Sequence, residues 1–259
     1  MSNGHTATQR LDPSGWSVRW EDARAHALVE SGDWRNLTMA DLARQRVRDD
    51  PDRILIVEGE GKLRASEIWQ RAQRLASSLL ARGLRPGDRI SYQLPNWSEA
   101  VVIDLAATLA GLVSNPLVPI YRQAELGFML DDCGSRLIFI PAQFRGFDYR
   151  AMMRGLLPKL AAKIDVIVLR GDPEEFEGYE DLLESACEFS PMPTVDPNAV
   201  KLVLYTSGTT GRPKGVLHTH NTVDVQGRQF GRIGTFTAAD RVLVASPVSH
   251  ITGAILAFH

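Results

Sequence analysis

The sequence predicts an α/β protein built on mainly parallel sheets flanked by helices. Short apolar runs typical of buried strands alternate with amphipathic runs typical of helices, and this alternation favours a parallel sheet covered on both faces. The chain has 259 residues and a hydrophobic content of 44%, which are ordinary values for a globular protein. A disordered chain, a collagen-like rod and a coiled coil are excluded by this composition.

Charge and cysteine content exclude further classes. The 29 Lys and Arg residues nearly balance the 31 Asp and Glu residues, so no strong field favours nucleic acid or an anionic membrane. No apolar run is long enough to span a membrane, and residues 1–13 lack the apolar core of a signal peptide. Cys133 and Cys187 have no metal-like spacing and are expected to be core residues. We therefore expect a cytoplasmic protein without nucleic-acid partners.

The first part of the chain predicts an extension followed by a helix. Residues 1–35 carry little periodic signal, but their tryptophans, Trp16, Trp20 and Trp34, stand among Arg and Glu residues. We expect an extension that lies on the body of the protein. Thr38 then opens a capping box for a short helix that ends before the acidic pair at residues 49 and 50.

A strand and a longer helix are expected next. The apolar run at residues 54–57 predicts the strand. Apolar residues spaced four, three and four apart predict one face of the helix, and Gly83 is expected to close it as a C-terminal cap. The residues on that face are Ile68, Ala72, Leu75 and Leu79.

The alternation continues along the rest of the chain. Asn96 is expected to cap one helix and Gly134 to close another, and the proline-rich residues 190–197 predict an extended linker. The predicted strands are residues 89–94, 137–140, 166–169, 202–205 and 242–245, and the predicted helices are residues 97–110, 123–133, 149–162 and 179–187.

The last residues form an apolar run, 251–258, without a cap, a polar tail or a turn after it. Natural chain ends are usually polar and exposed. From this run alone we expect a chain cut from a longer one.

Residues 205–215 carry the strongest chemical signal. Four aliphatic hydroxyls, three glycines and one lysine stand between the strand at 202–205 and a strand-like run at 215–218. Glycines let the backbone bend and approach a ligand closely, and successive backbone N–H groups form an anion-binding concavity beside the charge of Lys214. The segment predicts a polyphosphate-binding loop. Its expected ligands are Thr206, Ser207, Gly208, Thr209, Thr210, Gly211 and Lys214.

A Walker loop, a dinucleotide fingerprint and a flexible linker fit these residues less well. A Walker loop requires Gly directly before its Lys and a helix after it, whereas here Pro213 precedes Lys214 and a strand follows. No G-x-G-x-x-G opens a helix, so the segment is not a dinucleotide fingerprint. The Pro-Lys-Gly end and the flanking strands disfavour a flexible linker.

Residues 205–215 resemble, without a departure, the phosphate-loop signature of the acyl-adenylate-forming (AMP-binding) superfamily. The resemblance covers about residues 36–259. The segments 94–96, 115–116 and 119–122 resemble acyl-CoA ligases of the cyclohexanecarboxylate and medium-chain type. The resemblance implies that a carboxylate attacks the α-phosphorus of Mg-ATP to give acyl-AMP, and that the thiol of coenzyme A then displaces AMP.

The resemblance also implies a domain plan. Residues 1–35 would be an N-terminal extension, and residues 36–259 would be the N-terminal part of the AMP-binding domain. A first sheet subdomain would lie at about 84–234, with pieces of a second sheet subdomain at 36–83 and 235–259. Because a half-built sheet exposes an edge and an apolar face, self-association is expected.

A second motif of the family resembles residues 247–253. By this resemblance His250, Thr252 and Gly253 line the site near the acyl-phosphate junction, although a lone His before an apolar helix is more often structural. His218 and His220 would share one strand face. Two histidines without a third ligand make a weak metal site, so we expect them to support the phosphate loop.

Later family motifs, which would bind magnesium and ribose and supply the catalytic lysine, do not occur among these residues, so we predict neither a catalytic residue nor a metal ligand here. The leading hypothesis is the N-terminal part of an ATP-dependent acyl-CoA ligase of fatty acid metabolism, inactive by itself. ATP and Mg²⁺, a carboxylic acid and coenzyme A are implied for the whole enzyme. Two alternatives stay open: a non-catalytic nucleotide-binding or scaffold module, and part of a peptide-synthetase adenylation domain.

Overall fold

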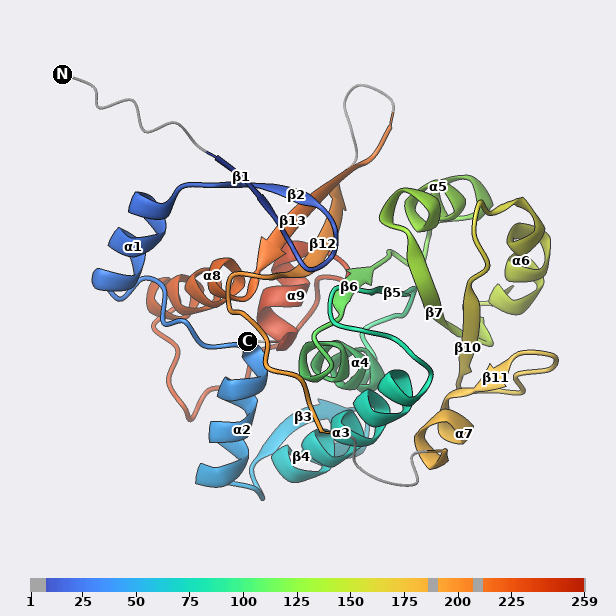
Figure 1. The fold of residues 1–259 in the computed structure, drawn as a ribbon. Helices are drawn as coiled ribbons and strands as arrows, with labels where there is room; N and C mark the ends of the chain where they lie inside the picture. The colour runs from blue at the N-terminus through green and yellow to red at the C-terminus, as the bar shows by residue number, and fades with distance from the viewer. Residues whose placement is uncertain (1–7, 186–190, 207–211, 259) are drawn as a thin grey trace.

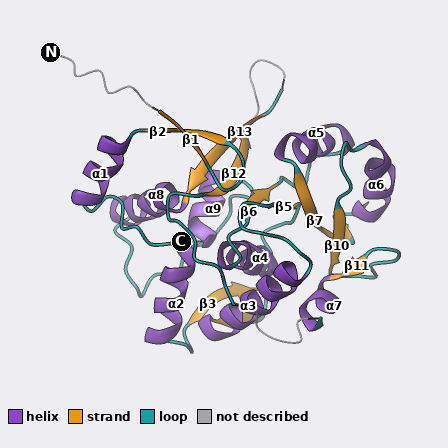
Figure 2. Cartoon of the chain, in the orientation of Figure 1, coloured by secondary structure: helices purple, strands orange, loops and turns teal. Residues whose placement is uncertain are grey.

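The structure is a computed structural model that describes residues 8–185, 191–206 and 212–258. Within these residues a central sheet has the strand order β11-β10-β7-β5-β6-β12-β13, and every neighbouring pair is parallel except β12 and β13 (Figure 1). Helices flank this sheet (Figure 2), which confirms the predicted fold class. The strands are β5 (Arg89–Tyr92), β6 (Val113–Pro116), β7 (Ser135–Pro141), β10 (Asp165–Leu169), β11 (Glu177–Gly178), β12 (Val200–Thr206) and β13 (Lys214–Thr219).

Side chains of β7 alternate between two apolar cores. Leu137 and Phe139 pack with residues of α3, α4 and α7, whereas Ile138 and Ile140 pack with residues of α5 and α6. Successive side chains of a strand point to opposite faces, so this alternation places a helical layer on each face of the sheet. These helices are α3 (Ala65–Ala81), α4 (Ser98–Leu109), α5 (Gln123–Cys133), α6 (Tyr149–Leu156) and α7 (Tyr179–Glu184).

The remaining elements surround this sheet. The hairpin of β3 (Ile54–Glu58) and β4 (Gly61–Arg64) is a separate two-stranded sheet, and β8 (Gln143–Phe144) pairs with β9 (Phe147–Asp148). Along the chain follow the helices α1 (Asp22–Glu30), α2 (Met39–Asp49), η1 (Leu157–Lys159), α8 (His220–Ile233) and α9 (Ile251–Phe258). No helix among the described residues has both the length and the apolar character needed to cross a membrane.

An N-terminal hairpin, β1 (Thr8–Leu11) with β2 (Ser17–Trp20), lies beside β12 and β13 (Figure 1). Trp16 in its turn packs in a small apolar cluster with residues of β12. The buried carboxylate of Asp12 accepts a hydrogen bond of 2.9 Å from the backbone N–H of Val200. A Cβ at Gly87 would lie 2.1 Å from the Pro13 carbonyl oxygen, so only glycine permits this approach.

Helix ends follow the sequence signals closely. Thr38 and Asp41 form the predicted capping box at the start of α2. Gly83, two residues after the end of α3, has a φ of +83°, and Gly134, directly after α5, has a φ of +66°, as expected of C-terminal caps. The predicted apolar face of α3 is confirmed, because its members are at most 4% exposed: Ile68, Ala72, Leu75 and Leu79.

Three predictions about elements are wrong. Residues 242–245 form no strand, because no neighbouring strand pairs with them within the described residues. The helix predicted at 149–162 ends at Leu156 and continues as a 3₁₀ turn, since Pro158 has no N–H to donate within a helix. Asn96 does not cap α4: Trp97 is the N-cap residue, and the Asn96 side chain bonds elsewhere.

Several bounds also differ. Strand β5 ends at Tyr92 rather than at residue 94, and α7 ends at Glu184, with residues 186 and 187 outside the described chain. Residues 191–196 are in neither helix nor strand, in agreement with the predicted linker. The prediction did not include β6, a four-residue strand that ends in Pro116, or α8, whose two glycines lower its helix propensity.

Candidate active site

The predicted phosphate loop is closed by an antiparallel stem. Thr206, the last residue of β12, lies opposite Lys214, the first residue of β13, and Tyr205 lies opposite Gly215. Because β12 runs parallel to β6, the stem leaves the sheet at its carboxyl-terminal edge, where open α/β sheets usually bind ligands. The other predicted phosphate ligands lie outside the described residues: Ser207, Gly208, Thr209, Thr210 and Gly211.

Helix α5 anchors both sides of this stem. The Tyr205 hydroxyl donates a 2.7 Å hydrogen bond to the Asp132 carboxylate near the end of α5. Burial and the neighbouring Asp132 raise the pKa of Tyr205, so its hydroxyl stays protonated and remains a donor. The Arg212 guanidinium lies 5.8 Å from the centre of the Phe128 ring, also on α5. The stem is therefore fixed at Tyr205, before the loop, and at Arg212, near its end.

Lys214 is exposed and has no ion-pair partner among the described residues, so its ammonium group is available to an anion. Thr206 beside it is also exposed, and its hydroxyl lies 3.4 Å from the Lys214 carbonyl oxygen. A Cβ at Gly215 would lie 3.0 Å from Val203 and 3.5 Å from the Tyr205 ring. A glycine at this position therefore keeps the stem flat against those two side chains.

The second motif forms a compact turn before α9. The His250 N–H donates to the Pro247 carbonyl (2.9 Å), and Nδ1 of the exposed His250 imidazole accepts from the Thr252 N–H (3.4 Å). A Cβ at Gly253 would lie 2.0 Å from the Pro247 carbonyl oxygen. Close backbone packing thus accounts for the glycine, while His250 is left facing solvent. The assignment of His250, Thr252 and Gly253 to an acyl site stays a prediction.

The sequence did not predict that the Asn96 side chain holds this turn in place. Asn96, which follows β5, donates from Nδ2 to the carbonyls of Val244 and Ser246 and accepts from the Val248 N–H. No sequence signal links residues about 150 positions apart. Gln93, directly after β5, makes similar bonds from its side-chain nitrogen to the carbonyls of Val118 and Tyr121.

The two neighbouring histidines do not share a strand face, contrary to the prediction. His218 lies in β13, whereas His220 begins α8 and is 2% exposed. Burial, together with the charge of Lys201, lowers the pKa of His220 to about 3. Among the described residues no group of three or more His, Cys, Asp or Glu side chains is placed to hold a metal ion.

A buried ion pair lies at the other end of β12 from the loop. Nζ of Lys201, 1% exposed, lies 2.7 Å from Oδ2 of Asp104 on α4. Oδ1 of Asp104 is buried and has no hydrogen-bond partner within the described part of the chain. Cys133 is buried as predicted, and burial raises the pKa of its thiol to about 11, while Cys187 lies outside the described residues.

A parallel α/β sheet with a glycine- and hydroxyl-rich segment at its carboxyl edge is typical of nucleotide-binding enzymes. The family model described as AMP-binding enzyme matches residues 43–259. The chain therefore belongs to the AMP-binding enzyme family, whose members form adenylates.

Several relatives of this chain are named as ligases. A medium-chain fatty-acid–CoA ligase of Escherichia coli is 32% identical over 241 residues, which are 92% of this chain and 42% of the relative. A salicyl-AMP ligase / salicyl-S-ArCP synthetase of Mycobacterium tuberculosis is also 32% identical, over 91% of this chain and 42% of the relative. The apo structure of MbtA from Mycobacterium smegmatis superposes with a TM-score of 0.80 at 28% identity, covering 92% of this chain and 45% of that one. The chain thus spans less than half of each protein.

Proposed function

We propose that the chain is the N-terminal part of an ATP-dependent acyl-CoA ligase and that it supplies the phosphate-binding loop. The observation that carries this proposal is the β12–β13 stem, which sets Thr206 opposite the exposed Lys214 at the carboxyl edge of the sheet. In the proposed reaction the substrate carboxylate attacks the α-phosphorus of ATP and pyrophosphate leaves. The thiol of coenzyme A then replaces AMP at the acyl carbon.

The chain's own residues act on the phosphates by position and charge. Lys214 neutralises charge on the β- and γ-phosphates, and the Thr206 hydroxyl offers a hydrogen bond beside it. The Tyr205–Asp132 bond and the Arg212–Phe128 contact hold the stem against α5, so that the loop is oriented before ATP binds. ATP-dependent adenylation uses Mg²⁺, but the described residues offer no ligand cluster for it, and we assign no step to that ion here.

The proposal extends to the domain plan and the setting of the enzyme. Residues 1–35 are the extension, residues 36–83 and 235–259 belong to a second sheet subdomain, and 84–234 to the first. His250, Thr252 and Gly253 border the acyl group, and the enzyme works on fatty acids in the cytoplasm. The relative named as a medium-chain fatty-acid–CoA ligase supports this choice of acid.

A second function is favoured by the other named relative. The salicyl-AMP ligase / salicyl-S-ArCP synthetase activates an aromatic acid, as its name states, and transfers the acyl group to an acceptor other than coenzyme A. Release of thioester from the complete enzyme, ATP and free coenzyme A distinguishes the two. If acyl-AMP forms but coenzyme A does not consume it, the second function is favoured. If the chain binds pyrophosphate but the complete protein never forms acyl-AMP, a scaffold module is favoured.

Titration with pyrophosphate tests the loop directly. Removing one charge-assisted contact weakens binding by about 1.5–3 kcal/mol, or roughly 10- to 150-fold, so we expect that loss for Lys214→Ala. Added salt should weaken wild-type binding as well, because the site is exposed. Lys62→Ala, an exposed lysine on β4, is the matched control and should bind like wild type. Equal pyrophosphate affinity in wild type and Lys214→Ala would overturn the proposed role of the loop.

The expected inactivity of the chain by itself is tested by trapping. The chain is incubated with ATP, magnesium and a panel of medium-chain and alicyclic acids, and acyl-AMP is captured with hydroxylamine. We expect no hydroxamate above the control without protein. A clear hydroxamate signal would show that these 259 residues already contain the catalytic groups.

A further inference from the structure

We infer that Asn96 is a positioning residue that aligns the turn carrying His250 with the carboxyl edge of the sheet. The inference rests on the proposed function, because only that function makes His250 part of an acyl site. The alignment itself is inferred only from the hydrogen bonds of Asn96 and does not depend on the proposed function.

Every hydrogen-bonding group of the Asn96 amide is engaged by one distant segment. Nδ2 donates to the carbonyl oxygens of Val244 and Ser246, both at 2.9 Å, and Oδ1 accepts from the Val248 N–H at 2.9 Å. Residues 241–245 belong to no helix or strand, so their carbonyls lack the partners that a sheet would supply. A single side chain therefore takes the place of a neighbouring strand for this segment.

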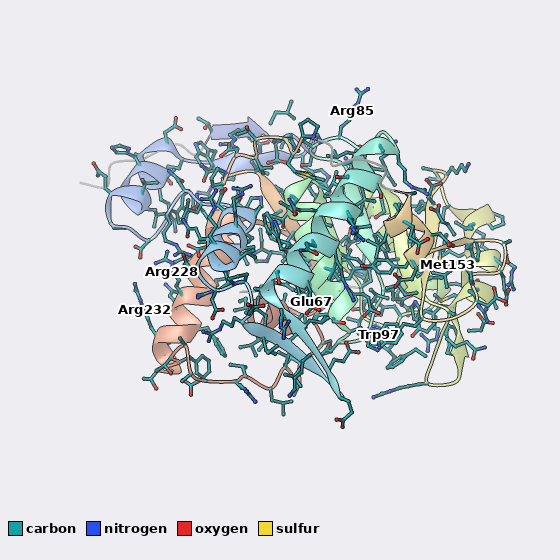
Figure 3. The ribbon with its side chains drawn as sticks, turned by 90° about the horizontal axis from the view of Figure 1, so that it is seen from below. Glu67, Arg85, Trp97, Met153, Arg228 and Arg232 are labelled. Atoms are coloured by element: carbon teal, nitrogen blue, oxygen red, sulfur yellow. The ribbon has the colours of Figure 1, made fainter. Side chains whose placement is uncertain are left out.

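Asn96 projects from a turn that is itself held on several sides. The Ser98 N–H at the start of α4 donates to Glu58 of β3 at 2.8 Å. The Arg170 guanidinium lies 4.1 Å from the centre of the Trp97 ring and within 2.7 Å of carboxylate oxygens of Glu58 and Glu99 (Trp97 is labelled in Figure 3). The turn thus joins β3, α4 and the end of β10, and these contacts fix the position of the Asn96 backbone.

The anchored segment transmits this position to His250. Val248 is 2% exposed, and the Pro247 carbonyl accepts from the His250 N–H. The same carbonyl approaches Gly253 so closely that no Cβ fits between them. Ile251 then packs against the apolar residues of β12 and α8. A displacement at Val248 therefore moves the imidazole relative to β12, whose last residue carries the phosphate loop.

Asparagine is the residue type that this arrangement requires. Aspartate keeps an acceptor for the Val248 N–H but faces two carbonyl oxygens with a negative charge and no donor. Alanine removes all the bonds. The two variants should therefore differ in which backbone amides lose protection. This difference distinguishes the loss of particular Asn96 hydrogen bonds from a general destabilisation of the fold.

Amide hydrogen exchange measured on this chain tests the geometry without any activity. We expect Asn96→Ala to lower protection of the Val248 amide by about tenfold, since one hydrogen bond is lost. Asn96→Asp should keep that protection, and amides of β7 should be unchanged in both variants. Gln45→Ala, which removes a side-chain amide from α2, is the control. Unchanged Val248 protection in Asn96→Ala would overturn the inference.

Kinetics of the complete enzyme test the functional half of the inference. We expect Asn96→Ala to raise KM for the carboxylic acid at least tenfold and to leave KM for ATP within about twofold. A parallel rise in both KM values would contradict a positioning role for the acyl side. If the wild-type enzyme forms no acyl-AMP, the proposed function fails, whereas the exchange experiment still decides whether Asn96 holds the segment.

Discussion

The central sheet and the periphery formed by the β3–β4 hairpin and residues 241–245 contain equally apolar runs. In β7 the side chains from Leu137 to Ile140 are completely buried. In β3 Leu55 is 46% and Val57 54% exposed, and Leu243 in the peripheral segment is 87% exposed. An apolar run therefore does not by itself define a buried strand. What distinguishes β7 is a hydrogen-bonded neighbour on each side and a helical layer on each face.

The largest effect should come from breaking the central sheet. Phe139→Ala removes a completely buried ring that also meets Tyr179 edge-on, so we expect a loss of about 3–5 kcal/mol in the free energy of unfolding. Val57→Ala on the exposed hairpin should cost less than about 1 kcal/mol. Urea denaturation of both variants measures the contrast. Similar losses for the two variants would show that the hairpin is buried in solution.

Breaking a buried ion pair of the central sheet should likewise cost more stability than breaking an exposed ion pair of the periphery. Lys201→Met leaves the buried Asp104 charge without its partner and should cost about 3 kcal/mol, a part of which the added Asp104→Leu substitution should restore. The exposed pair of Arg64 and Asp52 lies at the hairpin, and Arg64→Met should cost at most about 1 kcal/mol. Denaturation of the single and double variants gives these values. A double variant no more stable than Lys201→Met would contradict the view that the unpaired charge causes the loss.

Local elements were predictable because their signals lie within a few residues of one another. The apolar face of α3, the Thr38 capping box and the Gly134 cap all depend on spacing along the chain. The strand predicted at 242–245 failed because strand formation also needs a partner, and local hydrophobicity does not show whether one exists. Short β6 and glycine-containing α8 were missed because tertiary packing, rather than local propensity, stabilises them.

In the candidate site, too, some features were predictable from local sequence and others were not. Lys214 and the glycines could be found from composition, because the chemistry of a phosphate loop is concentrated in one segment. The bonds from Tyr205 to Asp132 and from Asn96 to Val248 join residues 73 and 152 positions apart. Only the three-dimensional arrangement of helices, strands and loops brings such pairs together, so a single sequence could not predict them.

Acid should weaken the core through the buried side chain of His220. The pKa of His220 is about 3 in the folded state against 6.5 as the ordinary value, so the unfolded chain binds the proton first as the pH falls. Stability from this group is complete above pH 6.5 and is lost as the pH falls from there toward 3. Between pH 7.5 and 5.5 the loss should be about 1.4 kcal/mol.

Urea denaturation at both pH values checks the His220 prediction. His220→Gln should lose less stability between pH 7.5 and 5.5 than the wild type, by about the same 1.4 kcal/mol. His26→Gln on α1, whose side chain is 76% exposed, is the control and should follow the wild type. Equal pH dependence in wild type and His220→Gln would mean that His220 is not buried in solution.

Substitutions in the exposed periphery should have the smallest effect on stability. We expect them to change the association between copies of the chain. Leu243→Lys replaces a side chain that is already 87% in water, so the free energy of unfolding should change by no more than about 0.5 kcal/mol. Because exposed apolar residues near unpaired strand edges favour contacts between copies, the wild type should show concentration-dependent association in sedimentation velocity. Leu243→Lys should reduce this association, because it replaces an exposed apolar side chain with a charged one. A wild-type chain that sediments as a monomer at all concentrations would contradict this prediction and would show that the exposed apolar residues of the periphery are tolerated in water.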